Sequence, residues 1–303
     1  MPRPRYALFR RTRSIQGVDR PGFDVRSGRG IRVQLIEQDV AANGARLRVY
    51  RTGTDKSPLV FAHGITDNGL CFVPIADQLS EDFEIVLYDA RGHGRSDPSP
   101  PGTTPLDRAY DLGALIEALE LSKPGLLGHS MGGATVALFA GLSPQVPGYI
   151  ILEDPQPFET LVPAGDQATE MRAHWRERTA ADRQKSIDEL VQISRLRDPT
   201  WPEAERLPWA QAKQQVSLTV FDEGFMDDVE SVKRILSQIV CPTLLVTADP
   251  QMGSLFSPAE ADELVASLPL ARHVSILGAG HNIRREQPNL YLEAVRDFLR
   301  GNT

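Results

Sequence analysis

A serine in this chain lies between two glycines, where a short apolar run gives way to a segment that favours helix. The motif reads Gly128-His129-Ser130-Met131-Gly132. In the pattern Gly-x-Ser-x-Gly, a sharp strand-to-helix turn lifts the serine hydroxyl out of a sheet, where it can attack a carbonyl carbon. Glycine is needed on both sides because a Cβ there would collide with neighbouring backbone. The spacing therefore predicts Ser130 as the nucleophile of an acyl-transfer reaction.

Two backbone amides are candidates for stabilising the oxyanion that such an attack creates. Met131 stands at the start of the predicted helix, where the helix dipole also favours negative charge. Ile65 follows His63-Gly64 at the end of another apolar run, and Gly64 lets the backbone approach the reacting atom closely. We therefore predict an oxyanion hole formed by the N–H groups of Ile65 and Met131, and a structural role for His63.

One histidine is placed to act as the general base. The chain has six histidines, and His281 follows a predicted strand through the flexible loop Gly278-Ala279-Gly280. Such a loop can project an imidazole over the sheet edge toward the serine. The others fall in predicted turns, in a strand or in an insertion: His63, His93, His129, His174 and His273. The order along the chain, serine before histidine, fits the same pattern.

The elements that must position these residues alternate along the chain. From about residue 31, short apolar runs alternate with segments of helical period, which predicts an α/β fold with a mostly parallel sheet. Asn43-Gly44 predicts a hairpin and an antiparallel edge. Predicted strands cover residues 31–40, 46–50, 58–62, 83–88, 125–128, 149–152, 242–247 and 272–277. Predicted helices cover residues 106–121, 131–142, 258–268 and 290–299.

The alternation breaks between residues 156 and 240, which contain two helical stretches, several prolines and all three tryptophans. We predict a helical insertion there, within a core formed by residues 31–155 and 241–303. Residues 1–30 form an arginine-rich extension before the first strand. We expect this extension to be either an arm that joins copies of the chain in a homo-oligomer or a solvated tail.

The charge and cysteine content of the chain narrow the range of partners. A net charge of −7 and a pI near 5.5 disfavour nucleic acid and anionic membranes, because both would be repelled. No apolar stretch reaches the length of a transmembrane helix. Cys71 and Cys241 lie far apart without metal-ligand spacing and indicate buried thiols in a reducing compartment. We expect a cytoplasmic protein that acts on a neutral small molecule and needs no metal or organic cofactor.

Four segments together resemble the α/β-hydrolase superfamily: His63-Gly64, Asp89–Asp97, Gly128–Gly132 and Gly278–His281. The resemblance spans about residues 30–300. It implies that Asp89–Asp97 is a structural loop after a strand, so that its arginines and histidine are not ligands.

The same resemblance implies that the insertion at 156–240 is a cap domain, which covers the pocket and determines substrate choice. Aromatic residues of this segment, among them Trp175, Trp209 and Phe221, then indicate an apolar substrate. The alternative is that these aromatic residues have a structural role and form the core of the cap itself.

The acid that would orient His281 has two candidates. The superfamily usually places it a few residues beyond the strand that ends here at Thr247, where the matching position is Gln251 and Asp249 lies two residues early. Asp249 could instead cap a turn. In some dehalogenases and in zearalenone lactonases the acid comes from the end of the preceding strand, where an ungapped comparison places Asp154. We favour Asp154, which adds a weaker resemblance to the zearalenone lactonases, and retain Asp249 as the alternative.

These roles predict a serine hydrolase that cleaves a carboxylic ester or lactone of an apolar molecule through an acyl-enzyme. C–C bond hydrolysis and cofactor-free perhydrolysis use the same side chains and remain alternatives. A ligand receptor that keeps the triad without turnover is a third, since a fold alone does not determine function. Epoxide hydrolases and dehalogenases are disfavoured because they carry aspartate where Ser130 stands.

Overall fold

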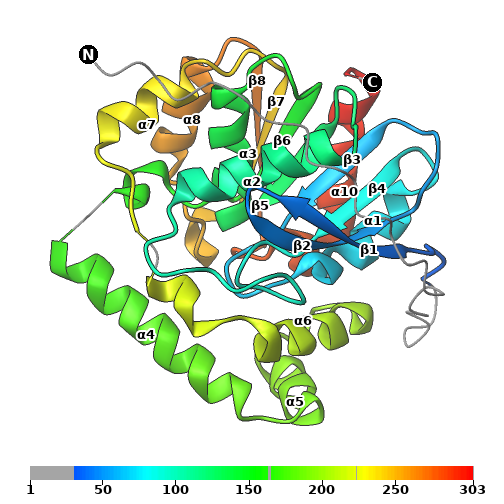
Figure 1. The fold of residues 1–303 in the computed structure, drawn as a ribbon, viewed down its shortest axis with the longest axis vertical. Helices are drawn as coiled ribbons and strands as arrows, with labels where there is room; N and C mark the ends of the chain where they lie inside the picture. The colour runs from blue at the N-terminus through cyan, green and yellow to red at the C-terminus, as the bar shows by residue number, and fades with distance from the viewer. Residues whose placement is uncertain (1–30, 163–164, 223, 303) are drawn as a thin grey trace.

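The computed structural model describes residues 31–162, 165–222 and 224–302. Within these residues, eight strands form one sheet in the order β1-β2-β4-β3-β5-β6-β7-β8 (Figure 1). The strands are β1 Ile36–Ala42, β2 Ala45–Arg51, β3 Pro58–Ala62, β4 Glu84–Tyr88, β5 Gly125–His129, β6 Tyr149–Glu153, β7 Thr243–Thr247 and β8 Ala271–Ser275. The arginine-rich extension, predicted to be an arm or a tail, lies outside the described residues.

The sheet is parallel except at its N-terminal edge. β1 pairs antiparallel with β2, and β2 pairs antiparallel with β4, while the other neighbours are parallel. Asn43 and Gly44 join β1 to β2 with φ values of 46° and 75°, the left-handed pair that a tight hairpin turn requires. The predicted fold class and antiparallel edge are therefore confirmed, although the first strand begins at Ile36 rather than at residue 31.

Helices cover both faces of the sheet, as the alternation predicts. Successive residues of β3 belong to different apolar clusters: Val60 packs in the cluster that contains α2 and α3, and Phe61 packs with α1 and α10. This period of two is expected for a strand buried on both faces. The helices of the first face are α2 Pro105–Ala118, α3 Met131–Leu142, α7 Val229–Leu236 and α8 Pro258–Ser267. Those of the second are α1 Val73–Leu79, α9 Ile283–Glu286 and α10 Pro288–Arg300.

Three further helices form a separate layer below the sheet in Figure 1. They are α4 Gly165–Arg183, α5 Ile187–Arg197 and α6 Glu203–Gln215, and short 3-10 turns flank them at Phe158–Leu161 (η2) and Leu218–Asp222 (η3). This layer, here called the cap, has a small apolar core formed by Leu190, Trp201, Trp209 and Ala210. The cap thus has three helices where two were expected.

The helix α7 also falls within the predicted insertion, but it does not belong to the cap layer. Its residues Val232 and Leu236 are buried in the same apolar cluster as α2 and α3. The structure therefore places the C-terminal part of segment 156–240 against the core.

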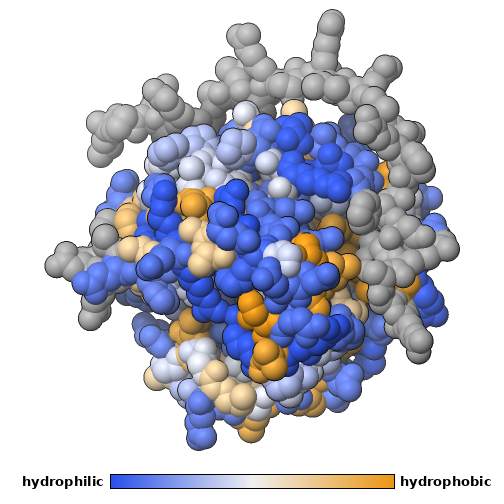
Figure 2. Space-filling view, turned by 90° about the horizontal axis from the view of Figure 1, so that it is seen from below, coloured by the Kyte–Doolittle hydropathy of each residue, from blue (hydrophilic) through white to orange (hydrophobic). Residues whose placement is uncertain are grey.

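The outer face of the cap is mostly hydrophilic. Figure 2 views the molecule from the cap side and shows charged and polar residues over most of this face, with apolar residues in small separate patches. Among the described residues, no helix is both long and apolar enough to cross a membrane.

Candidate active site

Ser130 occupies a strained turn between β5 and α3. Its φ of 54° and ψ of −119° lie in a region that residues other than glycine rarely adopt. The flanking glycines are required by close packing, because a Cβ on Gly132 would lie 2.1 Å from the Ala62 carbonyl oxygen, and one on Gly128 would lie 2.3 Å from the Gly132 carbonyl oxygen. The turn leaves Ser130 in the wall of a cavity at the carboxyl ends of the parallel strands.

His281 and Asp154 come together at the same edge of the sheet. Asp154 directly follows β6, and its Oδ2 lies 2.7 Å from Nδ1 of His281. The carboxylate is fully buried, whereas the His281 side chain is 31% exposed and lines the cavity with Ser130. A buried carboxylate on Nδ1 leaves Nε2 of the imidazole to exchange a proton with a nucleophile.

Further donors fix the orientation of the Asp154 carboxylate. The backbone N–H of Leu255 lies 3.2 Å from Oδ2, and the Ser254 hydroxyl donates to Oδ1 at 3.1 Å. Asp154 itself has a φ of 35°, an unusual value for a residue with a side chain. The connection after β7 thus supplies hydrogen bonds to the Asp154 carboxylate.

Asp249 lies in that connection and makes different contacts. Its carboxylate accepts hydrogen bonds from the backbone N–H groups of Gly278 at 3.0 Å and Gln251 at 2.9 Å. The Gly278 and Gln251 N–H groups lower the pKa of Asp249. Asp249 therefore caps a turn, and the structure brings Asp154 rather than Asp249 to His281.

The turn that carries Ile65 is held by two buried histidines. Nε2 of His63 accepts from the Ala90 N–H at 3.0 Å, and Nε2 of His93 lies 2.7 Å from the Ile65 carbonyl oxygen. Burial lowers the pKa of His63 to about 3, so this ring is neutral near pH 7. Both histidines thus have structural contacts, and Ile65 and Met131 line the cavity beside Ser130.

A group of six buried charges, here called the buried charge cluster, lies beside the site, and three of its members line the cavity. It consists of Asp67, Glu153, Glu205, Lys213, Arg284 and Arg285, each less than a tenth exposed. Asp67 is its centre, with ion pairs to Arg285 at 2.9 Å, Arg284 at 3.1 Å and Lys213 at 3.4 Å. Burial alone would raise the pKa of Asp67, but these three cations outweigh it and hold the pKa well below its usual range.

The buried charge cluster joins the segment that carries Asp154 to the segment that follows His281, and it joins both to the cap. Glu153, next to Asp154, accepts from the Arg284 backbone N–H at 3.0 Å and pairs with its guanidinium at 3.2 Å. Arg285 also pairs with Glu205 of α6 at 3.1 Å, which joins the cap to the core. The positive and negative members are equal in number, so the cluster is neutral as a unit.

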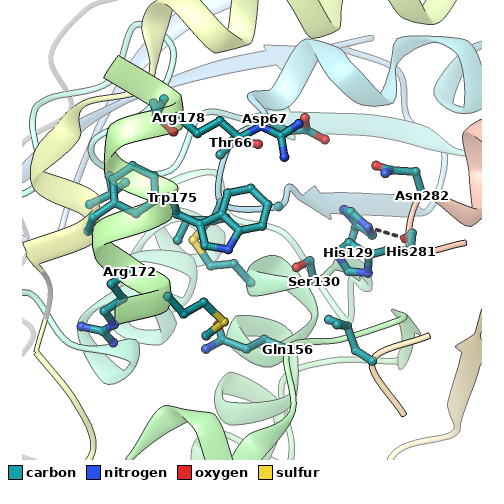
Figure 3. A pocket seen from close by; sticks show the side chains of 18 of the residues that line it. Thr66, Asp67, His129, Ser130, Gln156, Arg172, Trp175, Arg178, His281 and Asn282 are labelled. Carbon is teal, nitrogen blue, oxygen red and sulfur yellow. Dashed lines mark hydrogen bonds between the residues drawn. The ribbon is translucent and has the colours of Figure 1, made fainter. Parts of the chain in front are cut away.

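The cavity in front of Ser130 has a volume of about 850 Å³ and extends under the cap. Figure 3 shows the indole of Trp175 reaching from α4 over the region of Ser130, with Gln156 on the opposite side. The predicted substrate contacts Trp175, Trp209 and Phe221 all line this cavity. Trp209 and Phe221 are nevertheless buried, and Trp209 packs edge-on against Trp201, so both also build the cap's interior.

Sequence reasoning missed the side chains that support the predicted ones. Glu153 precedes Asp154 in the sequence, and Arg284 follows His281 by three positions. An opposite charge beside each of two predicted site residues was the signal that could have indicated this ion pair. Gln156, whose backbone N–H donates to the Ser130 carbonyl at 2.9 Å, carries no motif. Among the described residues, no group of three histidine, cysteine or acidic side chains is arranged to hold a metal ion.

Comparison with known proteins shows which family the chain resembles. The model of the alpha/beta hydrolase family matches residues 59–294. A 2-(acetamidomethylene)succinate hydrolase of Mesorhizobium japonicum is 27% identical over 80% of this chain and 87% of its own. Esterase YbfF of Escherichia coli is 26% identical over 81% of this chain and 94% of its own.

Solved structures show the same architecture. The crystal structure of an E-2-(acetamidomethylene)succinate hydrolase superposes with a TM-score of 0.68 at 24% identity, covering 88% of this chain and 99% of the other. The family model covers most of the chain, including the elements that carry Ser130, Asp154 and His281. The chain therefore belongs to the alpha/beta hydrolase family.

Proposed function

We propose that this chain is a serine hydrolase that cleaves a carboxylic ester or lactone through an acyl-enzyme. The observation that carries the proposal is the contact of 2.7 Å between Asp154 and His281, in a cavity that Ser130 also lines. A serine on a strained turn, a histidine and a buried acid are the parts that nucleophilic acyl transfer needs.

In the first half of the reaction, His281 accepts the proton of the Ser130 hydroxyl as its oxygen attacks the carbonyl carbon. The N–H groups of Ile65 and Met131 stabilise the oxyanion, and Asp154 stabilises the imidazolium that forms. The imidazolium then protonates the leaving alcohol oxygen as the bond to the carbonyl carbon breaks. In the second half, His281 activates a water molecule that attacks the acyl-enzyme and releases the acid.

Two relatives support different leaving groups. The Escherichia coli relative is named an esterase, which supports ester cleavage. The Mesorhizobium relative is named a hydrolase of an acetamidomethylene compound, which favours an amide-type substrate as the second candidate. Asp154 follows β6, which is where the resemblance to zearalenone lactonases predicts the acid, and this position supports a lactone as the substrate.

Replacing Ser130 with alanine tests the proposal. We expect Ser130→Ala to abolish covalent labelling by a fluorophosphonate and to lower kcat on 4-nitrophenyl esters by about 10⁴- to 10⁶-fold. Ser237→Ala, at an exposed position in the core domain, is the matched control and should keep both properties. Near-native turnover by Ser130→Ala would overturn the mechanism, and labelling of Ser130 without turnover of any ester, lactone or amide would favour a ligand receptor.

A further inference from the structure

The cavity wall differs in charge from the molecule as a whole. Three acidic side chains line the part of the wall that the structure describes, namely Asp67, Asp182 and Asp198. Six cationic side chains line it: Arg108, Arg172, Arg178, Arg197, Lys213 and Arg285. The wall thus carries three more positive than negative groups, whereas the chain has a net charge of −7. A concave surface of one sign attracts ligands of the opposite sign.

Each of the three acids in the wall is already paired. Asp67 is shared by Lys213 and Arg285 in the buried charge cluster. Asp198 pairs with Arg197 at 2.7 Å. Asp182 pairs with a lysine outside the cavity wall. These pairs account for three of the six cationic side chains of the wall, and Arg108, Arg172 and Arg178 are the other three.

Two of these arginines approach the cavity from opposite sides. Arg108 projects from α2 of the core and is buried, and Arg172 projects from α4 of the cap, with its guanidinium 3.7 Å from the centre of the Phe225 ring. Burial, and after it the charge of Arg172, lowers the pKa of Arg108 to about 10.

Arg178 is the third arginine, and it lines the cavity from an exposed position on α4. Its guanidinium lies 5.8 Å from the centre of the Trp175 ring, one turn away on α4. Both side chains project from α4 into the cavity in Figure 3. Within the part of the chain that the structure describes, Arg178 makes no ion pair. A guanidinium binds a carboxylate through two parallel hydrogen bonds, so an arginine at this place in the wall can recognise a carboxylate group of a ligand.

We propose that the substrate carries a carboxylate, which pairs with Arg178 while its reacting carbonyl lies at Ser130. Trp175 covers the apolar part of the molecule between these two points. The proposal specifies the substrate class and rests on the proposed hydrolase function for the reacting group. It replaces the neutral substrate expected from net charge alone, because net charge does not describe the sign of a cavity.

A matched pair of esters tests the pairing with Arg178. Mono-4-nitrophenyl glutarate and 4-nitrophenyl pentanoate have acyl chains of equal length, and only the first ends in a carboxylate. We expect kcat/KM to be about tenfold higher for the glutarate ester. Arg178→Gln should lower that value about tenfold, mainly through KM, and leave the pentanoate ester unchanged. Arg178→Lys should restore part of the loss because the charge returns without the two-pronged geometry.

Arg195→Gln is the control variant, because Arg195 is a cap arginine in an exposed pair with Glu203 and does not line the cavity. It should leave both esters unchanged. An Arg178→Gln variant that loses equal activity on both esters, or on neither, would overturn the carboxylate site and leave the serine hydrolase intact.

Binding of glutarate itself separates this proposal from the proposed function. Titration calorimetry of Ser130→Ala with glutarate requires no turnover, and adding Arg178→Gln should weaken the binding about tenfold. Binding that Arg178→Gln weakens, in a protein that cleaves no ester, lactone or amide, would remove the hydrolase function and keep the anion site. Absence of glutarate binding to Ser130→Ala, together with equal turnover of the two esters, would remove the anion site. Circular dichroism of each variant establishes that it is folded.

Discussion

The floor and the roof of the cavity are built in different ways. On the floor, Ser130, Asp154 and Ile65 follow the ends of neighbouring parallel strands, and partly buried hydrogen bonds hold Asp154 and Ile65. On the roof, α4 presents Trp175, which is 38% exposed, and Arg178. The comparison suggests that the sheet fixes the chemistry, whereas a cap helix that can change at little cost to stability selects the substrate.

The buried charge cluster and the surface ion pairs extend this contrast. The cluster fastens α6 to the core through Arg285 and Glu205, both about 1% exposed. The helix α4 is fastened to η3 by Arg176 and Asp222, which are both more than two-fifths exposed. Removing one partner of a buried ion pair lowers the free energy of unfolding by several kcal/mol, whereas removing one partner of an exposed pair changes it little. The two ends of the cap should therefore differ in how firmly they are attached.

The largest effect should come from the floor, at the acid. We expect Asp154→Asn to lower kcat by about 10⁴-fold, because asparagine holds His281 in the wrong tautomer and cannot offset its charge in the transition state. Asp249→Asn should leave kcat nearly unchanged, because Asp249 contacts only backbone N–H groups. Steady-state kinetics on one ester compares the two. If Asp249→Asn were the inactive variant, the geometry at Asp154 would not be the catalytic one.

The next effect concerns stability and the buried charge cluster. Arg284→Met leaves Glu153 and Asp67 short of a partner inside the protein, and it should lower the free energy of unfolding by about 3–5 kcal/mol. Urea unfolding measures this change. Arg284→Lys, which keeps the charge, should lose less. A loss for Arg284→Met below 1 kcal/mol would mean that the cluster contributes little to the rigidity of the floor.

The free energy of unfolding should also depend on pH through a buried histidine of the floor, His63. The folded pKa of His63 is about 3 and lies below the unfolded value of about 6.5, so the unfolded chain binds the extra proton between these values. The stability contributed by the neutral ring is complete above pH 6.5 and is lost as the pH falls, by about 1.4 kcal/mol per pH unit at most. Asp89 acts in the opposite direction, because burial raises its pKa to about 6.

Comparing wild type with His63→Gln isolates this contribution, since Asp89 is common to both. The free energy of unfolding of wild type, measured between pH 6.5 and 5, should fall more steeply than that of the variant. Equal slopes would show that His63 takes up no proton on unfolding.

The smallest effect should come from the roof. Arg176→Gln removes the exposed pair with Asp222 and should lower the free energy of unfolding by less than about 1 kcal/mol. The same urea titration used for Arg284→Met gives a direct comparison. A loss as large as that of Arg284→Met would remove the difference between the firmly and the lightly attached ends of the cap.

The sequence predicted those features that local chemistry determines. Gly-x-Ser-x-Gly identifies the turn at Ser130 because only glycine fits the close approach to Ala62. Alternating apolar runs predicted the sheet and its antiparallel edge. The short helix α1 was missed because its seven residues include a proline and carry no side-chain cap. The cap helices were undercounted for a similar reason, since their small apolar core leaves a weak periodic signal.

The remainder of the site depends on contacts between distant residues. Asp67 and Arg285 are 218 positions apart, and Glu153 and Arg284 are 131 apart, so no spacing rule connects them. The choice between Asp154 and Asp249 likewise depended on which carboxylate reaches His281 in space. Arg178 carried no signal, because an arginine on a polar helix is usually solvated and only the cavity distinguishes it.

The position of Asp154 directly after β6 also determines where the chain can be engineered. Because Asp154 comes from β6, the tip of the connection after β7 has no reactive side chain to preserve. Pro250, Gln251 and Met252 are exposed there, and a Cβ on Gly253 would meet no atom within 4 Å. Ser254 and Leu255 should be kept because they hydrogen-bond the Asp154 carboxylate, and Asp249 should be kept because it accepts from the Gly278 N–H. The tip is therefore a place where loop extension or grafting of a recognition peptide should leave the active site intact.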